Sequence, residues 1–162
     1  MADDLQRQGI PGEIVHYLDD FLAILPPHGN PETYGKRFAE LCSTVGLSIK
    51  DSKSVEGTTV SFGGVEIDNA KMVIRLPTKE LCKARAIAQA AANQNSLSLL
   101  ELQGLTGYLN FASIVTPLGR TFLCRLYQIY FPTQGPKCQR HLSTDAQKDL
   151  RWWEMILEAA PE

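Results

Sequence analysis

The first half of the chain carries short apolar runs of strand length. Two five-residue runs rich in strand-forming residues, Ile14–Leu18 and Phe21–Leu25, flank the pair Asp19-Asp20. This spacing predicts a β-hairpin with both acids at its tip. Pro26-Pro27 ends the second strand, because proline has no N–H to donate to a strand ladder.

A helical pattern follows this hairpin. From Pro31 to Val45 the apolar residues recur at spacings of three and four, which is typical of an amphipathic helix. Pro31 suits the first helical turn and Gly46 is placed to end the helix.

Two further strand-like segments come next, Val60–Ile67 and Met72–Leu76, joined by the turn-rich residues 68–71. They predict a second hairpin. Gly63-Gly64 lies inside the first of these segments and indicates a bulge or a close backbone approach.

The chain changes to helical patterns after Pro77. Thr78 is a candidate N-cap for a first helix, and Ser98 with Glu101 has the spacing of a capping box for a second. A third helix is predicted after Pro117, and a fourth begins at a candidate capping box of Thr144 and Gln147. A mixed front half and an all-helical back half predict an α+β fold, with segments 1–76, 77–141 and 142–162.

The composition is that of a water-exposed globular chain. Hydrophobic residues make up 44% and charged residues 21% of the 162 positions. No apolar run approaches the ~18–20 residues needed to cross a bilayer, so no membrane partner is expected. The N-terminal sequence MADDLQRQG lacks a signal peptide, which predicts an intracellular location, cytoplasmic or nuclear. The four dispersed cysteines are expected to be free thiols, most of them packing residues.

The small net charge of −2 conceals an uneven distribution. Residues 1–70 hold eleven acids and five bases, whereas residues 71–141 hold two acids and nine bases. The last 21 residues hold five acids and two bases. A basic block of this kind suits either a polyanion partner or an ordinary solvated surface.

Asp19 and Asp20 allow two interpretations. Aspartate is a good turn residue, so the pair can simply form a polar turn. Alternatively, adjacent carboxylates can bind a divalent cation, since Mg²⁺ takes carboxylates together with water and substrate phosphates. Paired Mg²⁺ ions support nucleotidyl transfer by holding the attacking and leaving oxygens.

The segment Tyr17-Leu18-Asp19-Asp20 resembles the YxDD box of reverse transcriptases. In that family the box lies on a hairpin of the palm domain, and its aspartates help to hold the catalytic metals. The order of the following segments is also similar: a helix, then Gly46-Leu47 with Lys53, then a primer-grip hairpin. Here Phe62-Gly63-Gly64 occupies the place of the family's Phe-Leu-Gly motif, with Gly63 where leucine is usual.

The likeness continues into a helical thumb. Leu99–Tyr127 is similar to the thumb and connection region of retrotransposon reverse transcriptases. The similarity is greater to DIRS-like elements than to gypsy-type elements. DLRWWEMIL resembles the lead-in to the RNase H domain that commonly follows. The resemblance implies an RNA/DNA template–primer partner.

The resemblance also implies roles for individual residues. Asp19 and Asp20 would be catalytic metal ligands. The candidates for nucleic-acid contact are Tyr17, Lys53, Phe62, Gly63, Gly64, Lys71, Arg75, Lys79, Lys83, Arg85, Arg120 and Arg125.

Other parts of the family's polymerase are not matched in this sequence. A further metal-binding aspartate and the fingers normally precede the YxDD box, and the RNase H carboxylates follow the region matched here. We therefore expect no polymerase activity from the chain alone. Mg²⁺ belongs to the complete parent enzyme and should bind weakly or not at all here.

Two hypotheses of function remain. The chain is either a fragment that supplies part of the metal site and the primer–template grip of a retroelement polymerase, or a co-opted or decayed product that binds nucleic acid or protein. In the first case its partners include the missing fingers, palm and RNase H portions. A cut palm sheet would leave open edges, which a homodimer or a strand swap would cover.

Overall fold

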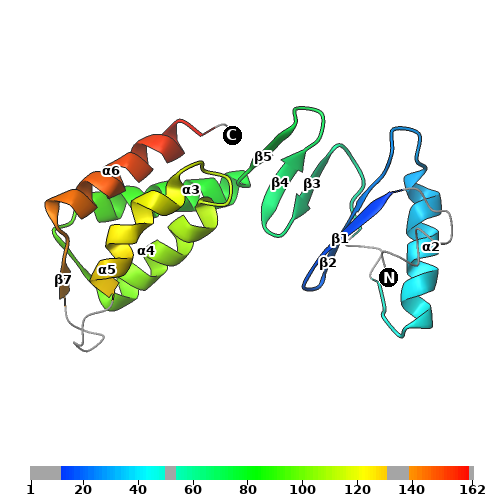
Figure 1. Ribbon diagram of the computed structural model, residues 1–162, viewed down its shortest axis with the longest axis horizontal. Coiled ribbons are helices and arrows are strands. Elements are labelled where there is room, and N and C mark those ends of the chain that lie inside the picture. Colours follow the sequence, from blue (N-terminus) through cyan, green and yellow to red (C-terminus); the bar gives the residue numbers. More distant parts are fainter. Residues whose placement is uncertain (1–11, 50–53, 131–138, 161–162) are drawn as a thin grey trace. The chain divides into compact units, whose positions relative to one another are not determined.

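The computed structural model describes residues 12–49, 54–130 and 139–160. The chain forms two compact units, Met1–Val73 and Ile74–Glu162, each with its own internal packing. Small strand pairs and five α-helices confirm the predicted α+β class (Figure 1).

The first unit begins with a two-stranded antiparallel hairpin, β1 (Glu13–Tyr17) and β2 (Asp20–Ile24). The predicted hairpin is confirmed, but the expected tip of Asp19-Asp20 is shifted by one residue. The two-residue loop is Leu18-Asp19, because Tyr17 pairs directly with Asp20. Asp20 is thus the first strand residue rather than part of the loop. This pairing directs Glu13, Val15 and Tyr17 to one face of the hairpin, since side chains alternate along a strand.

Helix α2 (Pro31–Thr44) covers the other face of this hairpin and agrees with the predicted helix. Phe21 meets Phe38 of the helix edge-to-face, with ring centroids 5.2 Å apart. The Asn30 side chain accepts a hydrogen bond from the Thr33 N–H at 3.1 Å and caps the helix. Gly46, with a φ of +78°, follows the helix end as predicted.

The predicted pairing of the second hairpin is present, but its first segment, Val60–Ile67, is not a single strand. Instead of one strand with a bulge, residues 59–68 form an antiparallel hairpin of β3 (Thr59–Phe62) and β4 (Val65–Asp68). Gly63 and Gly64 are its two-residue turn, and their φ values of +58° and +82° are those that a tight hairpin turn requires. The short strand β5 (Val73–Arg75) completes the sheet in the order β3-β4-β5.

The second unit is built on four α-helices: α3 (Thr78–Ala92), α4 (Leu99–Ala112), α5 (Cys124–Tyr130) and α6 (Thr144–Glu158). A 3₁₀ helix, η2 (Gly119–Leu123), leads into α5. Figure 1 shows α3 and α6 side by side, and they share one apolar core with α4 and α5. The largest side chain of this core is the fully buried Trp153, and its neighbours in the core include Leu81, Leu102, Leu105, Leu109, Leu126 and Leu150.

The second unit is not all-helical, contrary to the expectation. Strands β6 (Ser96–Ser98) and β7 (Gln139–His141) pair antiparallel, with Leu97 opposite Arg140. Each strand has three residues, too few for a period-two pattern to be recognisable in the sequence. The pair ties the entry of α4 to the entry of α6.

The caps of the helices are partly as predicted. Ser98 and Glu101 form the full capping box of α4. Thr78 is not an N-cap, because α3 begins at Thr78 and Pro77 precedes it without a side-chain bond. Helix α6 is capped by Ser143 instead of Thr144, and the Gln147 side chain donates hydrogen bonds to Gln94 and Asn95.

Two further expectations concern single residues and helix lengths. Cys42 is a buried free thiol as expected, but Cys82 and Cys124 are exposed free thiols and do not serve packing. Cys138 lies outside the described residues. Within the described segments, no helix is both long and apolar enough to cross a membrane.

The contact between Gly119 and Trp153 gives a test of the core. A Cβ at Gly119 would lie 2.7 Å from Trp153 Cη2, and the buried indole has no room to move. We expect Gly119→Ala to lower the free energy of unfolding by about 1–3 kcal/mol, the usual cost of overpacking. Chemical denaturation of the full chain measures this change.

Gly104→Ala is the matched control. A Cβ at this exposed helical glycine meets nothing within 4 Å. This substitution should raise the free energy of unfolding by about 0.5–1 kcal/mol, because alanine loses less conformational freedom than glycine in a helix. Equal effects of the two substitutions would contradict the described packing of Gly119.

Candidate nucleic-acid and metal site

The tip of the β1–β2 hairpin carries the two candidate metal ligands. Asp19 and Asp20 are both exposed, one in the loop and one at the start of β2. Leu18, which precedes them, has a φ of +53° and is 75% exposed. A left-handed backbone is uncommon for a bulky side chain and is found where the surrounding structure imposes it.

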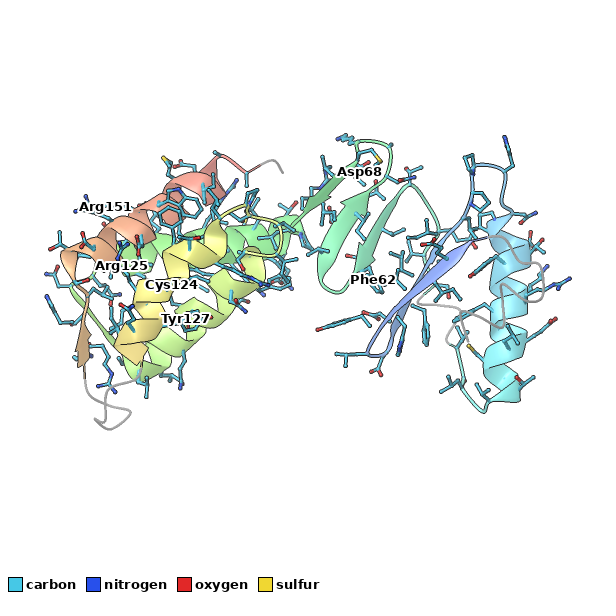
Figure 2. The ribbon with its side chains drawn as sticks, in the orientation of Figure 1. Phe62, Asp68, Cys124, Arg125, Tyr127 and Arg151 are labelled. Atoms are coloured by element: carbon cyan, nitrogen blue, oxygen red, sulfur yellow. The ribbon has the colours of Figure 1, made fainter. Side chains whose placement is uncertain are left out.

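A second turn lies beside this tip. The nearest atom to a Cβ built on Gly63 is Tyr17 Cδ1, at 3.9 Å. The structure therefore brings together the YLDD residues and the Phe62-Gly63-Gly64 turn, which the resemblance assigns to the primer grip. Figure 2 shows Phe62 and Asp68 on this second hairpin.

The hairpin tip has the donor type that Mg²⁺ prefers but few ligands. Asp19 and Asp20 offer carboxylate oxygens that are free to bind a hard cation, leaving the remaining positions to water or phosphate. Among the described residues, no three His, Cys, Asp or Glu side chains gather into a metal-binding group. Asp68, at the other end of the β3–β4 hairpin, is buried and accepts the Lys71 backbone N–H at 2.9 Å, so it stabilises the turn that follows it.

Two of the candidate cationic residues have structural partners. Arg125 donates to both carboxylate oxygens of Asp149, at 2.6 and 2.8 Å (Figure 2). The Asp149 side chain is 4% exposed, and its hydrogen bonds and charge raise the pKa of Arg125. This ion pair joins α5 to α6.

Arg85 likewise closes the end of a helix. Its guanidinium donates to the backbone oxygens of Leu157, Glu158 and Ala160, at 2.7, 3.3 and 3.1 Å. Leu157 and Glu158 belong to the last turn of α6, where carbonyls lack the usual i+4 partner, and Ala160 follows the helix end. Two of the nine basic residues in positions 71–141 thus hold the second unit together.

Other candidate cations face solvent. Lys71, Lys79 and Arg120 are exposed, and Arg75 is half-buried on β5. Lys83 pairs with Glu80 at 3.0 Å on the surface of α3, and the hydrogen bond to Glu80 raises the pKa of Lys83. Lys53 lies outside the described residues.

The exposed face of α4 is unusual for a helix in contact with water. One charged residue, Glu101, occurs in the helix, and the capping box occupies it. The side of α4 that points away from the core carries uncharged residues. Ile114 continues this side past the end of the helix. We call this set the α4 face: Leu100, Gln103, Gly104, Gly107, Asn110 and Ile114.

The two glycines of the α4 face have no internal role. A Cβ at Gly104 or Gly107 would meet nothing within 4 Å. Each glycine nevertheless costs the helix about 0.5–1 kcal/mol relative to alanine. Glycine at such a position allows a ligand to approach the helix backbone closely.

Lysines of α3 flank the α4 face. Lys83 Nζ lies 5.9 Å from the centroid of the Tyr108 ring, and the Tyr108 hydroxyl is 3.4 Å from Glu80. Lys79 is one turn earlier on the same helix. The surface therefore combines an uncharged, glycine-containing strip with cations at its side.

The sequence alone did not single out the α4 face. In the structure Asn110 is exposed, whereas Tyr108 and Phe111 are half-buried. The available signal was the near absence of charge in a helix with two glycines.

Comparisons with known proteins give the same fold. The chain is similar to a foamy viral protease-reverse transcriptase dRH in complex with double-stranded DNA, with a TM-score of 0.63 and 20% identity over 99% of this chain. It is also similar to a foamy viral protease-reverse transcriptase in complex with an RNA/DNA hybrid, with a TM-score of 0.65 and 20% identity over 99% of this chain.

The chain spans 27% and 21% of the lengths of these two proteins. No protein-family profile and no curated protein matches the sequence. The fold is therefore reverse-transcriptase-like over nearly the whole chain.

The different positions of the basic side chains lead to a prediction. Arg125→Met leaves the buried Asp149 carboxylate without two hydrogen bonds, and should lower the free energy of unfolding by about 1–3 kcal/mol. Lys79→Met is the control, since Lys79 makes no ion pair with any described residue, and should leave stability unchanged. Urea denaturation followed by circular dichroism compares them, and equal stabilities would contradict a structural role for Arg125.

Proposed function

We propose that this chain is the part of a retroelement reverse transcriptase, DIRS-like or gypsy-type, that grips the RNA/DNA primer–template and contributes two aspartates to the metal site. The observation that carries the proposal is the α4 face with its flanking lysines, in a reverse-transcriptase-like fold. The two neighbouring structures hold double-stranded DNA and an RNA/DNA hybrid, which supports a duplex as the ligand.

The chemistry of the α4 face suits the groove of a duplex. Gln103 and Asn110 can donate to and accept from groove edges and sugar oxygens. Gly104 and Gly107 let the duplex approach the helix backbone. A single-stranded ligand would instead favour exposed aromatic platforms, and the aromatic residues of α4, Tyr108 and Phe111, are half-buried.

Cations at the side of this face suit the phosphate backbone. Lys79 and Lys83 would contact phosphates, which position a protein on nucleic acid without reading its sequence. Glu80 holds Lys83 in the free chain, and a phosphate would compete for that ammonium group. Arg120 lines the same hollow as Ile114 and would add a positive charge at that end of the face.

The hairpin tip supplies the second part of the function. Asp19 and Asp20 would hold Mg²⁺, which neutralises charge on the transferring phosphoryl group when bound. Tyr17 pairs with Asp20 across the hairpin, and Gly63 lies beside Tyr17, so both would face the primer end. Without a third ligand among the described residues, metal affinity in the isolated chain should be weak.

Salt-dependent binding to a labelled RNA/DNA hybrid tests the grip. The chain should bind more weakly as salt rises, because phosphate contacts release counterions. Lys79→Ala/Lys83→Ala should make the slope of log affinity against log salt smaller by about 2. An unchanged slope would contradict phosphate contacts by these lysines.

Gly107→Leu tests the close approach separately from charge. A leucine projecting from the α4 face should lower hybrid affinity by about tenfold, or about 1.4 kcal/mol, without lowering stability. Gly35→Leu is the matched control, because Gly35 is another helical glycine at which a Cβ meets nothing within 4 Å. Equal affinities for the two variants would place the duplex elsewhere.

Metal dependence tests the hairpin tip. Asp19→Asn/Asp20→Asn should abolish any increase in hybrid affinity that Mg²⁺ produces, while leaving the affinity in EDTA unchanged, because the exchange removes metal ligands but not the lysine contacts. Titration with and without Mg²⁺ measures both values. A loss of affinity in EDTA would assign the aspartates another role.

A further inference from the structure

His16 lies one residue before the YLDD segment and contacts its loop. The His16 Nε2 atom is within hydrogen-bond distance of the Leu18 carbonyl oxygen. Because a carbonyl oxygen only accepts, Nε2 is the nitrogen that carries the proton and donates. The hydrogen bond passes over Tyr17, which lies between His16 and Leu18, and ends on the backbone of the loop.

The imidazole is held in place from its other side. Its ring stacks on Phe21, with centroids 4.5 Å apart and planes inclined by 22°. Phe21 is the direct cross-strand partner of His16 and in turn meets Phe38 of α2. A continuous line of contacts therefore runs from α2 through Phe21 and His16 to the carbonyl of Leu18.

We propose that His16 is a positioning residue that holds Leu18 in its left-handed backbone conformation and so sets the directions of the Asp19 and Asp20 carboxylates. This inference rests on the proposed metal role of the hairpin tip and names a residue that acts on it. A two-residue hairpin loop favours a positive φ at its first residue, but this conformation strains a leucine. Leu18 is 75% exposed and gains little packing to offset the strain, so its φ of +53° calls for a further restraint. The hydrogen bond to its carbonyl is such a restraint, and it acts directly before the first aspartate.

Three substitutions separate the hydrogen bond from the stacking. His16→Phe keeps an aromatic ring on Phe21 but removes the donor. His16→Gln keeps a donor but removes the ring. Leu18→Gly removes the need for a restraint, because glycine adopts a positive φ at no steric cost.

Nuclear magnetic resonance on the isotope-labelled full chain gives two readouts. The intraresidue amide-to-Hα cross-peak of residue 18 is strong when φ is positive, and so reports the loop conformation. Titration with Mn²⁺ broadens amide signals near a bound ion, and gives the affinity at residues 19 and 20. The first readout needs no metal.

His16→Phe should weaken the residue-18 cross-peak and lower Mn²⁺ affinity by about three- to tenfold, the worth of one hydrogen bond. His16→Gln should retain most of both. In the Leu18→Gly background, His16→Phe should change neither. Persistence of the strong cross-peak and full Mn²⁺ affinity in His16→Phe would overturn the proposal, as would an equal loss in both backgrounds.

Failure of the proposed metal function can be distinguished from failure of the His16 proposal. If Mn²⁺ broadens no signal at residues 19 and 20 of the unsubstituted chain, the proposed metal function fails. The cross-peak of residue 18 still decides whether His16 restrains the loop.

Discussion

The structure of the second unit depends on the burial of one side of α4. Leu102, Leu105, Leu109 and Ala112 are each at most 2% exposed and fill the core shared with α3 and α6. Since successive residues of a helix are rotated by a fixed angle, burial of this side forces Gln103, Gly107 and Asn110 outward. The α4 face is therefore a direct consequence of core packing, and the Ser98–Glu101 capping box fixes where the helix begins.

The first unit is organised by strand register in the same way. Pairing of Tyr17 with Asp20 leaves a loop of two residues, and a one-residue slip would turn every side chain to the opposite face. Stacking of His16 on Phe21 and the contact of Phe21 with Phe38 hold that register against α2. The candidate metal ligands and the proposed duplex-binding surface thus lie in separate units, each set by its own packing.

The sequence predicted well the structure that depends on neighbouring residues. It did not predict the pairing between distant segments. The first hairpin, α2 and the Ser98–Glu101 box were predicted because each depends on neighbouring residues. Gly63-Gly64 forms a turn, although a bulge or a close backbone approach was expected, since paired glycines suit all three. The bond between Arg125 and Asp149 joins positions 24 apart, and the pairing of β6 with β7 closes a longer loop, so neither leaves a periodic signal. The α4 face was not predicted from the sequence, because leucines occur on both sides of that helix.

Mapping of amide chemical shifts on addition of an unlabelled RNA/DNA hybrid tests the central claim most directly. The account predicts that the largest shifts fall on the α4 face and on Lys79 and Lys83 of α3, whether or not Mg²⁺ is present. Shifts at Asp19 and Asp20 should appear or grow when Mg²⁺ is added. Strong shifts confined to α5 and α6, with α4 unchanged, would contradict the assignment of the α4 face as the duplex-binding surface.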